Sequence, residues 1–545
     1  MAGKVESSTK KTFFSGVLLL TMSTVLVKII GLIYKIPMLA YLGSEGMGYF
    51  NSAYEIYALF CVISTAGLPV ALSVMISAAL AKGETGAVSR IYRAAWTVFF
   101  AVGAFGTGVM IIFARHFCDM IQSENAYLCI LSISPTVFFV CISSALRGYF
   151  QGFQKMMPTA ISQIIESAGK LLFGLLLARF ALQRGFDTAH VAAFAGVGLT
   201  LGTALSTFYL LLEKAHFHAK NEPIECEKRI GYCGVLKRLC KLAVPMTLGA
   251  SLVSLTKLID MTMILRRLQA IGYSEIAANE AYGSYTTLAL SVYGLLPALV
   301  NGVALPLVPM LSAAIASGDR EKQALMVHSS YRLTALFALP ASLGVTAFSY
   351  PILTLLFGHE PEAVDLAAPL LSCLGISVFL SCMITATNSV LHAYSEVNRP
   401  ILSLVIGAIV KIVSAYFLIG NDRIALMGAP VSTFLCNAAV VLCNLFFASK
   451  LCKVENLFAL FLKPLGAAVL SIGTALALYL PLSNRFGVSP LLTLVCILLA
   501  GFLYLLFSCL LGVLEAEDVQ AMPMGEKVSA VLIKLHLIPH DRYNR

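Results

Sequence analysis

The sequence predicts an all-α integral membrane protein, and three observations lead to this fold class. First, 59% of its 545 residues are apolar and 12% are charged, whereas soluble proteins carry about 25% charged residues. Second, apolar stretches of about 20 residues, the length that crosses a bilayer as a helix, recur from Phe13 to Leu514. Third, positive charge is concentrated in every second segment between these stretches.

Taken in order, the apolar stretches predict about fourteen transmembrane helices joined by short loops. Several contain proline or glycine, which membrane helices tolerate when neighbouring groups satisfy the freed backbone. The expected spans are residues 13–41, 50–80, 92–114, 125–149, 158–182, 189–213, 238–264, 281–312, 332–357, 364–388, 400–420, 425–449, 462–482 and 489–513.

The lysines and arginines of the loops predict the orientation of these helices. If the N-terminus is cytoplasmic, the segments on the inside carry 26 of the cations and the segments on the outside carry seven. Five further lysines lie within spans. By the positive-inside rule this predicts an even number of helices with both termini in the cytoplasm. The net charge of +10 is then an orientation signal that also attracts anionic lipid, and nucleic-acid binding is excluded.

An internal repeat divides the spans into two six-helix lobes. ALSVMISAALAKGE (71–84) ends the second span and matches PLVPMLSAAIASGD (306–319), at the end of the eighth, at 7 of 14 positions. NSAYEIY (51–57) matches NEAYGSY (279–285), and Lys28 of the first span has a counterpart in Lys257 of the seventh. Because six is even, both copies share one orientation. Parallel repeats of this kind place a central cavity between two lobes.

The repeat sets the expected domain organisation. We expect an N-lobe at 1–213, a cytoplasmic linker at 214–237, a C-lobe at 238–449, two appended helices within 450–514 and a cytoplasmic tail at 515–545. A transporter with two lobes in one chain can work as a monomer.

Ionisable residues within the spans form the candidate site. Each costs a few kcal/mol near the centre of a membrane, so it usually faces a cavity or a partner. The candidate substrate-binding cations are Lys28, Lys35, Arg147 and Lys257. The candidate acids, which could bind a coupling H⁺ or Na⁺, are Glu55, Glu166 and Asp260. The excess of cations predicts an anionic substrate that carries phosphate or diphosphate.

Structural roles stay open for several of these residues. Glu166 and Lys170 are spaced i, i+4 on one helix and form a candidate intramembrane pair that would only lower the cost of insertion. Lys35 and Arg147 lie near helix ends, where long side chains can reach the headgroups. Lys28 is deep in its span and has no acid one turn away, so it is the strongest candidate to face the cavity.

Motifs for enzymatic chemistry and for metal binding are missing. The sequence contains no G-x-x-x-x-G-K-[ST], no HExxH and no GxSxG, so ATP hydrolysis, zinc hydrolysis and serine hydrolysis are not expected. The short loops leave no room for the acidic clusters of a glycosyltransferase. We therefore expect a protein that is not an enzyme and has no resident cofactor or metal.

Three stretches carry a resemblance to a known family: LRGYFQGFQKMMPTAISQIIE (146–166), KIIGLIYKIPMLAYLGSEGMGYFNSAYEIY (28–57) and STAGLPVALSVMISAALAKGE (64–84). The chain resembles the polysaccharide-transporter branch of the MOP exporter superfamily over about residues 12–515. Within that branch it is similar to the stage V sporulation protein B group, which includes MurJ-like lipid II flippases. The resemblance implies a two-lobed fold of fourteen helices in the bacterial cytoplasmic membrane.

The resemblance also implies an activity, the export of an undecaprenyl-diphosphate-linked cell-wall precursor by alternating access, with lipid II as the leading substrate. Proteobacterial members carry an Arg-Asp pair where this chain has Tyr34 and Lys35, so the cation function is implied at Lys28 and Lys35. The implied partners are the lipid-linked oligosaccharide, membrane lipids and cell-wall synthases.

Other functions stay open at this point. One is a flippase for another lipid-linked oligosaccharide, such as a teichoic-type one. A MATE-like multidrug cation antiporter should favour acids in its cavity, whereas the first span is rich in lysine. A membrane scaffold that recruits cell-wall synthases would tolerate loss of the intramembrane charges. The sequence does not distinguish a vegetative role from one in sporulation.

Overall fold

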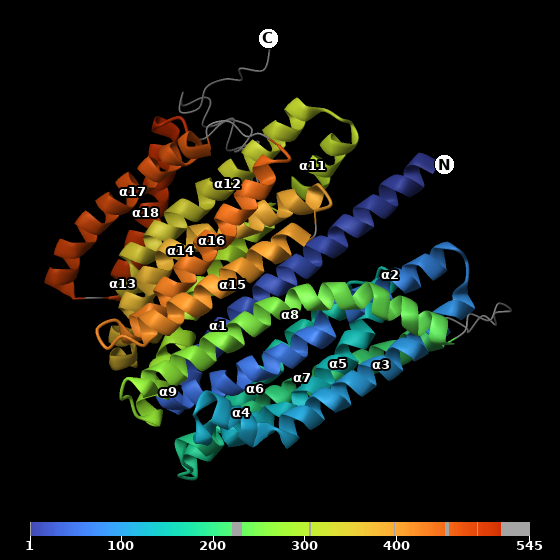
Figure 1. Cartoon of the computed structure of the whole chain (residues 1–545), viewed down its shortest axis with the longest axis horizontal. Coiled ribbons are helices and arrows are strands. Elements are labelled where there is room, and N and C mark those ends of the chain that lie inside the picture. The colour runs from blue at the N-terminus through green and yellow to red at the C-terminus, as the bar shows by residue number, and fades with distance from the viewer. Residues whose placement is uncertain are drawn as a thin grey trace. The chain divides into compact units, whose positions relative to one another are not determined.

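Helices make up all the regular structure of the chain where it is described. The computed structural model describes residues 2–220, 232–304, 307–396, 398–452, 457–487 and 489–513 (Figure 1). No strand occurs within these residues, which confirms the all-α prediction. The helix is the expected element because an apolar chain in lipid must satisfy its backbone hydrogen bonds internally.

The chain divides into two compact units. Unit 1 comprises Met1–Thr287 and Ile419–Leu426, and unit 2 comprises Leu288–Leu418 and Met427–Arg545. The linker expected at 214–237 is helical at both ends, and its centre, 221–231, lies outside the described residues, as does the expected tail at 515–545. The parallel repeat and the cavity between two lobes stay predictions.

Unit 1 holds nine α-helices among its described residues. They are α1 (Ala2–Thr65), α2 (Leu68–Ala81), α3 (Thr85–Ile112), α4 (Ala114–Ile121), α5 (Tyr127–Gly152), α6 (Met157–Gln183), α7 (Thr188–Lys220), α8 (Tyr232–Ala270) and α9 (Glu275–Ser284). A short 3-10 turn, Glu124–Ala126, precedes α5, and a π-helix, Tyr285–Ala289, follows α9. In Figure 1, α5, α6 and α7 lie side by side, and all three pack against α1.

The helix α1 contains a kink that turns it into two segments. Gly43 has φ 64° and ψ 178°, a backbone conformation that favours glycine because it lacks a Cβ. The candidate membrane span here covers 60 residues, Met22–Ala81, or about 90 Å of helix, against about 30 Å for the hydrocarbon core of a bilayer. The length therefore fits the two spans expected at 13–41 and 50–80 better than one.

Two segments matched by the sequence repeat touch each other within unit 1. The α1 segment that contains 51–57 packs against α9. Asn51 Nδ2 donates hydrogen bonds to the hydroxyls of Thr286, at 2.8 Å, and Thr287, at 2.9 Å. Glycines permit the close approach, because a Cβ on Gly48 would stand 2.1 Å from the Asn279 carbonyl oxygen. The tight packing holds the π-helix against α1.

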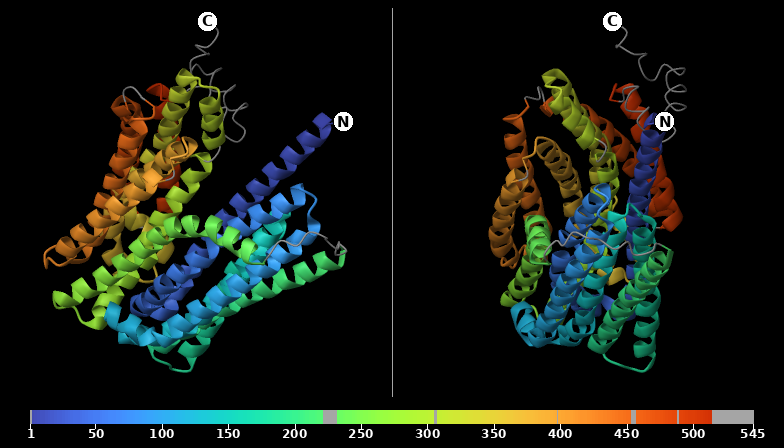
Figure 2. Two further views of the ribbon diagram at one scale, coloured as in Figure 1. Left: turned by 45° about the vertical axis from the view of Figure 1, so that its right-hand side comes forward. Right: turned by 90° about the vertical axis from the view of Figure 1, so that its right-hand side faces the viewer.

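Unit 2 holds the remaining helices of the described chain. They are α10 (Leu290–Ala304), α11 (Leu307–Ala316), α12 (Arg320–Ala347), α13 (Ser349–Phe357), α14 (Pro361–Ala393), α15 (Asn398–Ile419), α16 (Gly428–Ser449), α17 (Leu457–Phe486) and α18 (Pro490–Leu510). The helix α14 packs against both α12 and α16. Both views of Figure 2 show α17 and α18, coloured orange to red, running alongside each other.

The number of membrane spans is only partly settled. Within the described residues eleven helices are long and apolar enough to cross a bilayer, or twelve if α12 and α13, bent by 77°, form one broken span. The eighth expected span, 281–312, is divided among the end of α9, the π-helix, α10 and α11. The multi-pass membrane architecture is confirmed, and the count of fourteen stays a prediction.

Candidate functional site

The eight ionisable residues of the candidate site all lie in unit 1, whereas Lys411, a further lysine within an expected span, lies on α15 in unit 2. They come from four helices, α1, α5, α6 and α8, and comprise five cations against three carboxylates: Lys28, Lys35, Arg147, Lys170, Lys257, Glu55, Glu166 and Asp260. The set therefore carries a net positive charge. We call these eight residues the charged cluster.

Arg147 is held between α5 and α6 by an ion pair. Its Nη2 lies 2.8 Å from Glu166 Oε2, and the two side chains are 13% and 24% exposed. The Arg147 Nε donates to Ser162 Oγ at 2.9 Å, and Nη2 also donates to Ser206 Oγ at 3.4 Å. Both serines are fully buried. Arg147 is thus held within the helix bundle by contacts to α6 and α7.

Lys170 lies among aromatic rings, and Glu166 forms its ion pair across helices. The Nζ of Lys170 is 4.8 Å from the ring centroid of Tyr54, 5.0 Å from Tyr34 and 5.8 Å from Phe50. These distances are those of cation–π contacts, which stabilise a cation out of water. The i, i+4 spacing on α6 still leaves an electrostatic interaction between Lys170 and Glu166.

Three lysines come together from α1 and α8. Lys35 Nζ donates to the Thr286 carbonyl oxygen at 3.3 Å, in the π-helix, an element often found at functional sites. Lys35 also interacts electrostatically with Lys170 and Lys257, and Lys28 interacts with Lys257. Lys28 and Lys257 are exposed within unit 1. Like charges held this close attract a shared anion, because the anion relieves their repulsion.

Two acids of the cluster, Glu55 and Asp260, lie on α1 and α8, the helices that also carry these lysines. Glu55 interacts electrostatically with Lys35. Glu55 and Asp260 both interact electrostatically with Tyr282, a buried residue of α9. The acids therefore moderate the positive charge without neutralising it.

Close packing of α6 on α7 determines where the charges of α6 lie. A Cβ on Gly202 would stand 2.5 Å from the Lys170 amide nitrogen and 3.0 Å from the Glu166 carbonyl oxygen. A Cβ on Gly198 would stand 2.3 Å from Gly174 Cα. Gly198 and Gly202 form a GxxxG pattern, which lets two helix backbones approach closely.

The sequence interpretation missed the neutral partners of the charged residues. Ser162 and Ser206 hold Arg147, and Phe50 and Tyr54 surround Lys170. Ser162 lies one turn before Glu166 on α6, a spacing that could have marked it as facing the same way. Ser206, Phe50 and Tyr54 are on other helices, so no spacing within α6 indicates them.

Unit 2 provides a different kind of site, an apolar groove of about 450 Å³. It lies among α10, α12, α13, α17 and α18, and its polar lining residues are Ser471 and Tyr504. The Tyr504 hydroxyl donates to the Leu336 carbonyl oxygen at 2.7 Å. The groove therefore offers apolar surface, which suits a hydrocarbon chain.

Family comparisons match both parts of the chain. The model of the polysaccharide biosynthesis protein family matches residues 13–315, and the MatE model matches residues 245–417. Lipid II flippase MurJ of Bacillus subtilis (strain 168) is 25% identical over 414 residues, which cover 73% of this chain and 76% of the relative. Stage V sporulation protein B of the same organism is 23% identical over 447 residues, covering 82% and 84%.

Solved structures share the fold. A structure of lipid II flippase MurJ in an inward closed conformation superposes with a TM-score of 0.69 at 16% identity, covering 90% of this chain and 98% of that one. An inward-facing multidrug resistance transporter of the MATE family gives a TM-score of 0.58 at 14% identity, covering 80% and 98%. The chain belongs to the polysaccharide biosynthesis protein family, in the group of MurJ and stage V sporulation protein B within the MOP superfamily.

Proposed function

We propose that this chain is a flippase that exports an undecaprenyl-diphosphate-linked cell-wall precursor across the bacterial cytoplasmic membrane by alternating access. Lipid II is the leading substrate, and its transport is not an enzymatic reaction. The observation that carries the proposal is the charged cluster, in which five cations outnumber three carboxylates on the helices of unit 1. A diphosphate is the part of the substrate that such a cluster would bind.

The substrate also has a long hydrocarbon tail, and the apolar groove of unit 2 suits it. The groove is large and almost wholly apolar. The similarity of this chain to lipid II flippase MurJ and stage V sporulation protein B also supports a polyprenyl-linked substrate. A teichoic-type lipid-linked oligosaccharide would present the same two chemical parts, so the sugar is what separates these substrates.

We assign the coupling of transport to H⁺ or Na⁺ uptake at Glu55 or Asp260. Both carboxylates lie near Tyr282, and Glu55 also lies near Lys35. An anionic substrate that binds the lysines would change the electrostatic potential at these acids, and this change would link substrate binding to ion binding. We place both termini in the cytoplasm, in line with the distribution of loop cations.

The proposal is tested in cells depleted of their native lipid II flippase, with this chain supplied in trans. Labelled lipid II should reach the outer leaflet only when the intact chain is present. Lys28→Ala and Lys35→Ala should each lower the rate roughly tenfold or more, since each removes one charge-assisted contact with the diphosphate. Lys463→Ala, which removes an exposed lysine of α17, is the matched control. Normal transport by both cluster variants would remove these lysines from the site.

A multidrug cation antiporter is the second candidate, because the MatE model matches residues 245–417. An organic cation would be repelled by the surplus of lysine and arginine in the charged cluster, so we rank this function lower. Efflux assays with cationic dyes distinguish the two. Resistance to dyes without lipid II transport would favour the antiporter, and the reverse result would favour the flippase.

A further inference from the structure

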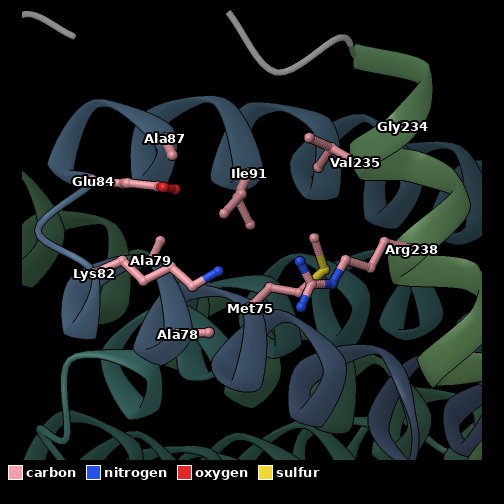
Figure 3. A pocket seen from close by; sticks show the side chains of 10 residues that line it. All are labelled: Met75, Ala78, Ala79, Lys82, Glu84, Ala87, Ile91, Gly234, Val235 and Arg238. Atoms are coloured by element: carbon pink, nitrogen blue, oxygen red, sulfur yellow. The ribbon is translucent and has the colours of Figure 1, made fainter. Parts of the chain in front are cut away.

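A second basic site lies at the ends of three helices of unit 1, apart from the charged cluster. It is a small pocket of about 70 Å³ between the end of α2, the start of α3 and the start of α8 (Figure 3). None of the eight residues of the charged cluster lines it. Its charged lining residues are Lys82, Glu84 and Arg238.

The two cations approach the pocket from different helices. In Figure 3 the Lys82 side chain, which follows α2, and the Arg238 side chain, from α8, extend toward each other across the pocket near Met75. Among the described residues neither forms an ion pair. Both cations are exposed, so they are available to a ligand that enters from outside.

The electrostatics favour a ligand with one negative charge. Two cations and the Glu84 carboxylate give the pocket a net charge of +1, and a phosphodiester carries −1. The pocket also lies beside the first turn of α3, where the helix dipole favours an anion. No heavy atom lies within 4 Å of the position that a Cβ would take on Gly234, so α8 leaves space beside this residue.

The remaining lining matches the edge of a membrane. Three candidate spans, Met22–Ala81, Gly86–Ile112 and Tyr232–Ala270, end or begin beside the pocket. Its walls include the buried apolar side chains of Met75, Ile91 and Val235. Basic pockets between transmembrane helices at the cytoplasmic boundary suit lipid headgroups, and Lys82 and Arg238 belong to the loop cations expected on that side.

We propose that this pocket binds the phosphodiester headgroup of an anionic phospholipid from the inner leaflet. Lys82 and Arg238 hold the phosphate, and Glu84 accepts a hydrogen bond from a headgroup hydroxyl beyond it. The apolar wall contacts the glycerol backbone and the first methylenes of the acyl chains. This site is independent of the transported substrate, since it uses none of the charged cluster.

Native mass spectrometry of the purified full-length chain tests the assignment. The protein is titrated with phosphatidylglycerol, an anionic phosphodiester with headgroup hydroxyls, and with zwitterionic phosphatidylcholine. We expect one phosphatidylglycerol molecule to be retained preferentially. The Lys82→Gln/Arg238→Gln variant should bind it roughly 30-fold more weakly, since each cation contributes on the order of fivefold.

A matched control removes the same charge from the same end of the molecule. Lys237→Gln/Lys241→Gln changes two exposed lysines of α8 that do not line the pocket, and its affinity should stay at the wild-type value. Lys82→Arg/Arg238→Lys keeps both charges and should retain binding. Thermal unfolding in detergent checks that every variant is folded, and single variants replace any double variant that is not.

Each alternative result overturns the assignment in a distinct way. Equal losses in the pocket variant and the control would mean diffuse attraction to surface charge. Displacement of the lipid by inorganic phosphate at equal concentration would make the ligand a soluble phosphate. Stronger displacement by undecaprenyl diphosphate would make the pocket part of the transport path. Normal lipid binding by the pocket variant would exclude the site itself.

Discussion

Arg147 and Glu166 form an ion pair although each charge loses hydration in the helix bundle. Their contact at 2.8 Å compensates for this loss only while both are present. The buried hydroxyls of Ser162 and Ser206 accept further hydrogen bonds from Arg147. The pair therefore links α5 to α6 and orients the carboxylate next to the cluster lysines.

Removing one member of this pair should be worse than removing both. We expect Arg147→Ala to destabilise the protein by about 1–3 kcal/mol, because it leaves the partly buried Glu166 without its hydrogen-bonded ion-pair partner. Arg147→Ala/Glu166→Ala should recover most of that loss. Thermal unfolding in detergent measures both, with Arg93→Ala, at an exposed arginine of α3, as the control. Equal destabilisation by the single and double variants would contradict the pair's role.

The residues of the cluster could be predicted from sequence, but their partners could not. Ionisable side chains within apolar stretches stand out by composition alone. Their contacts depend on which helices are neighbours, and the partner of Glu166 is 19 positions away on another helix. The spacing within α6 suggested Lys170 instead, which lies among the rings of Tyr34, Phe50 and Tyr54.

Among the elements, α6 and α7 are held together by glycine contacts beside the charged residues. The backbones meet where Gly169 faces Gly202 and where Gly174 faces Gly198. In a membrane such contacts replace the hydrophobic effect as the source of helix association. Glycine has no side chain, so Gly198 and Gly202 let α6 lie close to α7. The position of Glu166 and Lys170 relative to α1 and α5 depends on this close approach.

Adding a methyl group at this interface should disturb the cluster without changing any charge. Gly198→Ala and Gly202→Ala place a Cβ 2.3–2.5 Å from backbone atoms of α6, so the helices must move apart. We expect each to lower stability by roughly 1–3 kcal/mol and to reduce transport. Gly31→Ala is the control, because nothing lies within 4 Å of its Cβ position. The interpretation fails if all three variants unfold at the wild-type temperature.

Helix type could be predicted throughout, whereas helix boundaries could not be predicted where the chain bends. Apolar stretches indicated the expected spans 13–41 and 50–80 as separate helices, and the kink at Gly43 does divide α1 there, but the second expected span is itself divided between the end of α1 at Thr65 and α2. The π-helix Tyr285–Ala289 interrupts the expected eighth span. The π-helix is hydrogen-bonded to α1 through Asn51, a contact that hydropathy does not report.

At the scale of the whole molecule, the two units differ in chemistry, and α8 and α9 of the expected C-lobe belong to unit 1. The charged cluster belongs to unit 1, and the apolar groove belongs to unit 2. A repeat is detected from residues that pack alike, so it predicts the helix arrangement and not the site. The difference between the units lies in individual positions, such as the lysines of α1 and the small groove-lining residues Ala500 and Gly501 of α18.

This division predicts that the two parts of an amphiphilic substrate can be tested separately. Gly501 lines the groove and has open space at its Cβ position, so Gly501→Phe should fill the groove without a clash. Transport of lipid II with its full polyprenyl chain should fall roughly tenfold or more, since about 40 Å² of lost apolar contact corresponds to about 1 kcal/mol and blocked access adds to it. A short-chain analogue should be transported at the wild-type rate.

The matched control for this experiment is Gly466→Phe, on α17. Gly466 also has open space at its Cβ position and does not line the groove. Gly466→Phe therefore adds the same aromatic ring to unit 2 outside the groove. Lys28→Ala should slow the long and short substrates alike, because both carry the diphosphate. If Gly501→Phe slows both substrates equally, or if Gly466→Phe matches its effect, the groove does not hold the hydrocarbon tail and the charged cluster alone recognises the substrate.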